Sequence, residues 1–300
     1  MVLVSLSHLC SYFLVNFLTT SFMIALLQNL TWGIDPEIFS LGPIAPRWYG
    51  LLFAGAFVSG YMFGVKMWKD AGRKVEEMES ILTWILVATV IGARLGHVIF
   101  YDPSYYLRNL DQVLAVWNGG LASHGAAIGV IIALYYQAKK APKMNFWWLA
   151  DRVVIPSAVG GAFIRTGNFF NSEIVGSATD APWGVIFTNL AGPAGTIPRH
   201  PTMLYEALLC LAVFAVLWFL YKKYKAHPPE GSLFGIFLIM LFTGRFFLEY
   251  TKIPQADFAT EWAVNMGQLL SIPMVLIGLY IVLKKVDWGK RSESPANPNP

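Results

Sequence analysis

The chain has 300 residues, of which 56% are hydrophobic and only 13% are charged, against roughly 25% charged residues in an average soluble domain. With a mean hydropathy of +0.52, this composition excludes an ordinary water-soluble protein and favours the lipid bilayer as the solvent. The net charge of +4 is modest, and because no basic amphipathic stretch accompanies it, nucleic acid is not a predicted partner.

The first segment, residues 1–33, is an apolar N-terminal stretch of uncertain status. Its first 30 residues contain no charged side chain and a single histidine, and they lack the basic start of a signal peptide. Three interpretations stay open: an eighth span, a gene start upstream of a true initiator at Met23, or a disordered or interfacial segment.

Seven later segments have the length and apolarity of transmembrane helices. A span needs about 20 mostly apolar residues, and the seven segments are 47–65, 81–101, 119–138, 146–169, 203–221, 233–250 and 264–283. Polar, proline-containing or charged stretches separate most of them. The fold is therefore predicted to be an all-α polytopic membrane protein with about seven transmembrane helices.

The basic residues predict the direction of each span. Cytoplasmic loops carry an excess of Lys and Arg. Fourteen of the 22 basic residues lie in four clusters after the first, third, fifth and seventh spans: Lys66, Lys69, Arg73, Lys74; Lys139, Lys140, Lys143; Lys222, Lys223, Lys225; Lys284, Lys285, Lys290, Arg291. The first span therefore starts outside, and the C-terminus is predicted to be cytoplasmic.

The segments between the spans complete the predicted organisation. Residues 171–201 are rich in Gly, Pro, Asn and Thr, and they are predicted to form a small external cap with a short strand at 183–187. Residues 291–300 are rich in Pro, Asn and Ser, which is typical of a disordered tail. Residues 34–290 are thus expected to form one transmembrane domain that carries this cap.

Several ionisable residues lie inside the predicted spans, where they are costly and usually functional. With the spans oriented as above, six of them fall at one depth in the outer leaflet: Arg94, Arg165, Arg245, Glu206, Glu249 and His124. The planar fork of arginine holds phosphate through two parallel hydrogen bonds. The pattern favours a pocket for a phospholipid headgroup, although a purely structural role for one Arg–Glu pair stays open.

Local spacing adds further candidates to this pocket. Arg165 and Asn168 share a helix face, and the polar turn that follows holds Asn171, Glu173 and Gly176. Tyr49 and His200 complete the outer polar layer, with His200 an alternative to His124 as a proton acceptor. Because neither cysteine, Cys10 or Cys210, has metal-ligand neighbours and no such cluster exists elsewhere in the sequence, no metal is predicted.

An ordered set of motifs runs along residues 34–285. The motifs are Arg47-Trp-Tyr-Gly-Leu, Gly92-Ala-Arg-Leu-Gly, Asn118-Gly-Gly-Leu-Ala-Ser-His-Gly, Arg165-Thr-Gly-Asn-Phe-Phe-Asn-Ser-Glu-Ile-Val-Gly176, Pro198-Arg-His-Pro-Thr-Met-Leu-Tyr-Glu206, Gly244-Arg-Phe-Phe-Leu-Glu249 and Asn265-Met-Gly-Gln268. Together they resemble the prolipoprotein diacylglyceryl transferase family.

The resemblance implies a transferase of the bacterial inner membrane whose active site faces the periplasmic leaflet. Such an enzyme moves the diacylglyceryl group of phosphatidylglycerol to the lipobox cysteine thiol of a prolipoprotein and releases glycerol phosphate. It needs no metal or organic cofactor. The family's histidine and its two key arginines match His124, Arg165 and Arg245.

The same resemblance implies roles for the surrounding residues. Catalytic residues would be His124, Arg245 and Tyr49, and the lipid-binding residues would be Arg165, Asn168, Asn171, Glu173, Gly176 and Glu249. His200, Glu206 and Arg94 are secondary candidates. A few positions depart from the common pattern, among them Lys252, which stands where an arginine is usual.

Two other functions could share this composition. A lipid transporter or flippase would need a polar route through the inner leaflet, and the inner halves of these spans carry few charges. A polyprenyl-phosphate transferase would share the arginine pocket but would not need a thiol acceptor. The transferase of the resemblance is the primary prediction.

Overall fold

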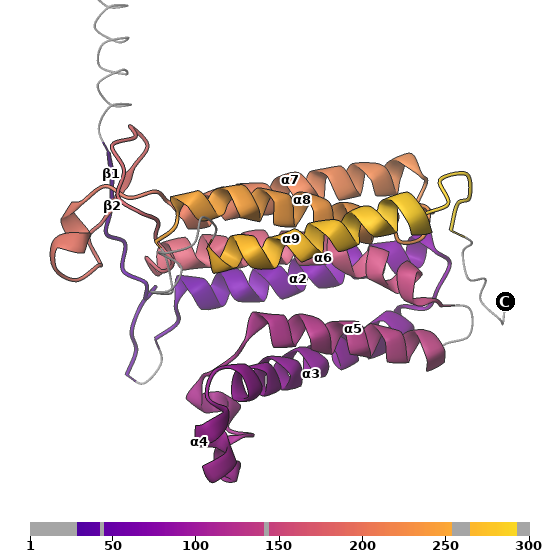
Figure 1. Ribbon diagram of the computed structural model, residues 1–300, viewed down its shortest axis with the longest axis horizontal. Coiled ribbons are helices and arrows are strands. Elements are labelled where there is room, and N and C mark those ends of the chain that lie inside the picture. The colour runs from indigo at the N-terminus through magenta and orange to yellow at the C-terminus, as the bar shows by residue number, and fades with distance from the viewer. Residues whose placement is uncertain (1–28, 43–44, 141–143, 254–264, 293–300) are drawn as a thin grey trace, which may run out of the picture. The chain divides into compact units, whose positions relative to one another are not determined.

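The computed structural model describes residues 29–42, 45–140, 144–253 and 265–292, and it is mainly helical within these ranges (Figure 1). Its α-helices are α2 (Trp48–Asp70), α3 (Val75–Phe100), α4 (Pro103–Arg108), α5 (Ser123–Lys140), α6 (Phe146–Phe170), α7 (Thr202–Lys223), α8 (Ser232–Leu248) and α9 (Met266–Tyr280). Short 3-10 turns join some of them, a π-helical turn, Ile281–Lys285, continues α9, and two three-residue strands are β1 (Leu30–Trp32) and β2 (Val185–Phe187).

All seven predicted spans are helices, so the prediction of a polytopic helical membrane protein is confirmed. Five of them are long and apolar enough to cross a membrane: α2, α3, α7, α8 with its 3-10 extension to Thr251, and α9 with its π turn. The other two are α5, which has 18 residues, and α6, which contains Asp151, Arg152 and Arg165.

The chain divides into two compact units. Unit 1 comprises residues 1–55, 161–209 and 244–271, and unit 2 comprises residues 56–160, 210–243 and 272–300. Five helices, α2, α6, α7, α8 and α9, contribute residues to both units, whereas α3, α4 and α5 belong to unit 2 alone.

In unit 2, α3 and α5 lie side by side through glycines (Figure 1). A Cβ atom on Gly92 or Gly96 would collide with the backbone of Gly125, and one on Gly129 would collide with the backbone of Ala88. Small residues allow helices in a membrane to approach closely enough for extensive van der Waals contact. These glycines therefore set the spacing of the α3–α5 pair.

The packing of α8 in unit 2 explains two charged residues inside the fourth predicted span. The carboxylate of Asp151 accepts hydrogen bonds from the backbone N–H groups of Gly231 (2.7 Å) and Phe234 (2.8 Å), which satisfies the amino end of α8. Arg152 stacks over the Trp148 ring at 3.5 Å and donates to the Ala226 carbonyl. Both residues thus stabilise the α7–α8 connection.

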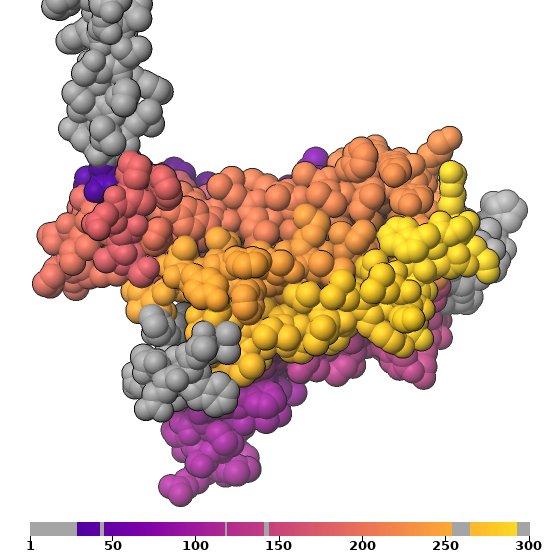
Figure 2. Space-filling model, turned by 45° about the horizontal axis from the view of Figure 1, so that its top comes forward, coloured from indigo at the N-terminus to yellow at the C-terminus, as the bar shows by residue number. Residues whose placement is uncertain are grey.

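The amino-terminal part of α8 contacts the carboxyl-terminal end of α9 and its π turn in unit 2, where Leu238, Ile281 and Val286 form a buried cluster. Figure 2 shows the yellow end of the chain against the orange surface of α8. Gly235 allows this contact because a Cβ there would meet Val282 and Ile281.

Unit 1 contains the cap, residues 171–201. The predicted strand is confirmed as β2, and its parallel partner β1, with Leu30 opposite Val185, was not predicted. The Trp32 ring lies 4.2 Å from that of Phe169, which belongs to a buried cluster with Val185, Phe187 and Met203. The interpretations of the N-terminal segment 1–33 rest mainly on residues 1–28, and most of the predicted tail is 293–300; both of these ranges lie outside the described residues.

Candidate active site

The first component of the site in unit 1 is an ion pair between two helices. Arg165 on α6 places its Nε atom 2.9 Å from Oε2 of Glu206 on α7. The Glu206 side chain is 5% exposed and that of Arg165 is 24% exposed. Arg165 contacts Glu206 through Nε, and because its two terminal nitrogens contact no other polar group among the described residues, both can bind another anion.

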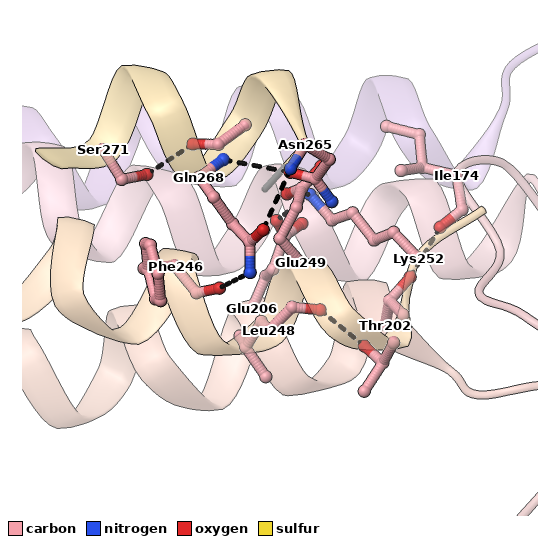
Figure 3. Close-up of polar contacts among 12 residues, drawn as sticks. Ile174, Thr202, Glu206, Phe246, Leu248, Glu249, Lys252, Asn265, Gln268 and Ser271 are labelled. Atoms are coloured by element: carbon pink, nitrogen blue, oxygen red, sulfur yellow. Dashed lines mark hydrogen bonds and ion pairs between the residues drawn. The ribbon is translucent and has the colours of Figure 1, made fainter. Parts of the chain in front are cut away.

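Lys252 extends this pair into a chain of four charges, of which Figure 3 shows Glu206, Lys252 and Glu249. Its Nζ atom lies 2.8 Å from Oε1 of Glu206 and 3.2 Å from Oε2 of Glu249, and the lysine side chain is only 8% exposed. Lys252 follows the 3-10 turn Glu249–Thr251 at the end of α8, and there it neutralises two buried carboxylates together with Arg165.

Glu249 also contacts the start of α9. A Cβ on Gly267 would collide with the Glu249 carboxylate, so the carboxylate lies directly against the glycine backbone. Asn265 and Gln268 exchange side chain-to-backbone hydrogen bonds of 3.0 Å across the first turn of α9, which is a reciprocal cap (Figure 3). Glu249 therefore contacts Lys252 and the start of α9, and no ion pair joins it to Arg245 among the described residues.

The turn after α6 holds Glu173 between two amides. Asn168 donates to Glu173 Oε2 (3.0 Å), Asn171 donates to Glu173 Oε1 (3.1 Å), and the Glu173 N–H donates to the Asn168 carbonyl. Ser172 and Ile174 have φ values of 54° and 57°, a left-handed backbone that turns the chain sharply at this point. The side-chain carbonyls of both asparagines are buried and accept no hydrogen bond from a described residue.

Two glycines explain how other predicted residues are placed. Gly167 on α6 lies under the ring of Tyr49 on α2, since a Cβ there would be 2.8 Å from Cδ2 of Tyr49. Gly176 is enclosed by Thr251, Thr202 and His200, and its N–H donates to the His200 carbonyl (2.9 Å). Gly176 therefore has a packing role in the cap.

Arg245 and His200 complete the predicted residues of unit 1. Among the described residues, the half-buried guanidinium of Arg245 has no ion pair or hydrogen bond. The hydroxyl of Tyr205 lies 3.2 Å from Nδ1 of His200 and accepts a hydrogen bond from the Trp183 indole (2.8 Å). Tyr205 of α7 thereby joins two residues of the cap, His200 and Trp183.

Two predicted residues, His124 and Arg94, belong to unit 2. His124 is the second residue of α5, is exposed, and packs against Phe100 (ring centroids 5.2 Å apart) and Tyr101 (6.0 Å). Arg94 is buried in α3, and backbone carbonyls surround its guanidinium. Arg94 was predicted on the depth of its position alone, and this environment gives it a role different from that of Arg165.

The unit 1 site can bind an anion. Arg165 and Lys252 are balanced by Glu206 and Glu249, and Arg245 adds one further positive charge. Such a set suits a singly charged phosphodiester. No group of three or more His, Cys, Asp or Glu side chains suited to a metal ion occurs in the part of the chain that the structure describes.

Comparisons with known proteins agree on one family. A family model described as prolipoprotein diacylglyceryl transferase matches residues 36–284. Three relatives are named phosphatidylglycerol–prolipoprotein diacylglyceryl transferase. The protein of Tolumonas auensis is 45% identical over 85% of this chain and 96% of its own length. Those of Chloroherpeton thalassium and Porphyromonas gingivalis are 39% and 41% identical over 85% and 86% of this chain, and 94% and 95% of their own lengths.

Proposed function

The chain belongs to the prolipoprotein diacylglyceryl transferase family, and we propose that it transfers the sn-1,2-diacylglyceryl group of phosphatidylglycerol to the lipobox cysteine of a prolipoprotein signal peptide. The names of the relatives supply the two substrates. A cysteine is a suitable acceptor because its thiolate is a strong nucleophile.

The reaction is a displacement at carbon. The thiolate sulfur attacks the glycerol carbon that carries the phosphodiester, a C–S bond forms, and the C–O bond to the phosphate breaks. The electron pair of that bond leaves with glycerol phosphate, and the thiol proton passes to a base. The protein therefore has to hold the phosphate, stabilise its growing negative charge and accept one proton.

The geometry of Arg165 is the main support for phosphate binding at this site. Glu206 holds the Nε atom of Arg165, so the two terminal nitrogens can form parallel hydrogen bonds to two phosphate oxygens. Glu206 would be a positioning residue for this fork, and Lys252 would keep Glu206 in place from its other oxygen.

Arg245 is suited to the charge that grows on the leaving phosphate. The charges of Arg165 and Lys252 are compensated by Glu206 and Glu249, whereas Arg245 has no ion pair among the described residues. A guanidinium without a fixed partner can form its strongest contact with the leaving group, which favours the transition state over the bound substrate.

The asparagines next to Glu173 suit the glycerol headgroup. The buried side-chain carbonyls of Asn168 and Asn171 accept no hydrogen bond from a described residue, and an unsatisfied buried acceptor is costly. Hydroxyl groups of the headgroup glycerol could donate to them. This would favour phosphatidylglycerol over phospholipids whose headgroups lack such hydroxyls.

The assignment of the base to His124 rests on the family resemblance. His124 is exposed at the start of α5, and imidazole accepts a proton near neutral pH. The alternative, His200, is engaged with Tyr205 in the cap. By the positive-inside pattern, the site faces the periplasmic leaflet of the bacterial inner membrane and the C-terminus is cytoplasmic.

A substitution series in the full-length protein tests the roles of these residues. With lipobox peptide saturating, Arg165→Lys should raise the KM for phosphatidylglycerol because lysine lacks the planar fork. Arg47→Lys, an exposed arginine paired with Glu37, is the control and should leave KM unchanged. His124→Gln should abolish turnover without changing lipid affinity. Normal affinity in Arg165→Lys would contradict the two-bond model, and full turnover in His124→Gln would exclude that base.

A further inference from the structure

Arg94 is buried without a carboxylate partner among the described residues. Its exposed fraction is 3%. Its Nε atom donates to the carbonyl of Val113 (2.9 Å), Nη2 donates to that of Gln112 (2.5 Å), and Nη1 donates to those of Gly119 (2.6 Å) and Gly120 (3.2 Å). The guanidinium also lies 5.1 Å from the Tyr106 ring centroid. With these donors occupied, Arg94 has little capacity left for a lipid phosphate.

All four carbonyls belong to the connection between α3 and α5. Near its end, two residues before the last one, this connection contains a pair of glycines with positive φ, Gly119 at 80° and Gly120 at 71°. Gly120 packs so closely that a Cβ there would lie 2.8 Å from Nη1 of Arg94 and 2.6 Å from the His97 ring. Arg94 therefore fixes the path of the chain just before α5 begins.

That path leads directly to His124. Two residues after Gly120, the Ala122 N–H donates to the Ala93 carbonyl (2.9 Å), which joins the end of the connection to the residue beside Arg94. His124 follows two residues later and rests on the Phe100 and Tyr101 rings of α3. The position of the imidazole is thus defined relative to α3 by the connection on one side and by ring contacts on the other.

We infer that Arg94 is a positioning residue for His124, which it acts on through the backbone of residues 112–120 and not through the lipid phosphate. This inference rests on the proposed role of His124 as the base. A lysine could not replace Arg94, because one ammonium group cannot donate to four carbonyls that surround a planar fork. A misplacement of about 1 Å in a reacting group can reduce the rate roughly 100-fold.

The test compares two pairs of variants in the full-length protein. Arg94→Lys is matched by Arg108→Lys, an exposed arginine at the end of α4 in the same connection. Gly120→Ala pushes directly on Arg94, and its control Gly119→Ala introduces a side chain at a similar positive φ into open space. The measurements are kcat, the KM for phosphatidylglycerol, and the rate at which diethylpyrocarbonate modifies His124, followed by mass spectrometry of the peptide.

We expect Arg94→Lys and Gly120→Ala to lower kcat by roughly 100-fold with the KM for lipid within twofold of normal. The modification rate of His124 should change in both variants, and the two controls should change these values much less. If Arg94→Lys fails to fold, Gly120→Ala carries the same test because it keeps the arginine.

Two results would overturn the inference. A raised KM for lipid with normal kcat in Arg94→Lys would show that Arg94 contacts the phosphate, and normal kcat in both Arg94→Lys and Gly120→Ala would show that it has no positioning role. The variant His124→Gln separates this failure from that of the proposed function. If His124→Gln is active, His124 is not the base and the proposed function loses that assignment. If His124→Gln is inactive while Arg94→Lys is fully active, only the positioning role of Arg94 is refuted.

Discussion

Glu206→Gln removes one negative charge from the centre of the site while keeping the size of the side chain. Glu206 lies between Arg165 Nε (2.9 Å) and Lys252 Nζ (2.8 Å) and is 5% exposed, so both cations lose a partner in a place that water reaches poorly. Removing one member of a buried ion pair costs about 3–5 kcal/mol. Because Glu249 still compensates Lys252 and Arg165 is partly exposed, we expect the lower end, about 3 kcal/mol.

Activity should fall for a separate reason. Arg165 loses the ion pair that holds its fork in one orientation, and a polar contact to a charged group contributes about 1.5–3 kcal/mol. Since 1.4 kcal/mol corresponds to a factor of ten in an equilibrium constant, the KM for phosphatidylglycerol should rise roughly 10- to 100-fold. Thermal unfolding in detergent, followed by tryptophan fluorescence, measures the first effect, and initial rates measure the second.

Two further variants separate stability from lipid binding. Glu37→Gln breaks the exposed pair with Arg47 and should cost only about 0–1 kcal/mol. Adding Lys252→Met to Glu206→Gln leaves the buried Glu249 without its remaining partner, so it should lower the stability further and should not restore the KM for lipid. A Glu206→Gln protein with native stability and native KM would refute the reasoning.

Three other predictions follow from the same site and from unit 2. Arg245→Ala should reduce kcat by roughly 100- to 1,000-fold, as expected for a group that donates hydrogen bonds to developing charge. The same variant should barely change the unfolding temperature, because Arg245 has no ion pair among the described residues. A large loss of stability would contradict this description of Arg245. Gly167→Ala should raise the KM for lipid because its Cβ displaces the Tyr49 ring, whereas Gly50→Ala, which meets open space, should not; equal effects of the two on KM would disprove this contact. Burial, together with the charges of Arg152 and Arg291, lowers the pKa of His227. The folded state therefore favours neutral His227, and its contribution to stability is present above the unfolded pKa of about 6.5 and is lost as the pH falls below that value. The unfolding temperature should accordingly fall less between pH 7.5 and 5.5 in His227→Gln than in the native protein, and identical pH profiles would exclude this role.

The helices were predictable because each depends on a local property of the sequence. A run of about 20 apolar residues has no stable alternative to a helix in a bilayer, since every backbone polar group must be paired within the segment. All seven predicted spans are helices for this reason. Strand β2 was also local, with its apolar residues 185–187, but its partner β1 lies more than 150 residues away, and no local pattern specifies that pairing.

The site was predicted by depth, and depth alone could not assign partners. Arg165 and Glu206 were placed at one level, and the structure pairs them. The partners of Lys252 were not predictable, because it follows the last apolar residues of its span and no local pattern specifies its contacts. In the structure, Lys252 follows the 3-10 turn Glu249–Thr251, and its ammonium group contacts Glu206 and Glu249. The sequence also could not distinguish Arg94 from Arg165, because a buried arginine that donates to backbone carbonyls has the same sequence signature as one that binds phosphate.

A single assay tests the central claim most directly. Purified protein in detergent is incubated with phosphatidylglycerol and a lipobox peptide, and with a control peptide in which the cysteine is replaced by serine. The account predicts that glycerol phosphate is released only when both the lipid and the thiol are present, with one diacylglyceryl group added to the peptide for each glycerol phosphate. Release without the thiol, or no release from folded protein, would contradict it.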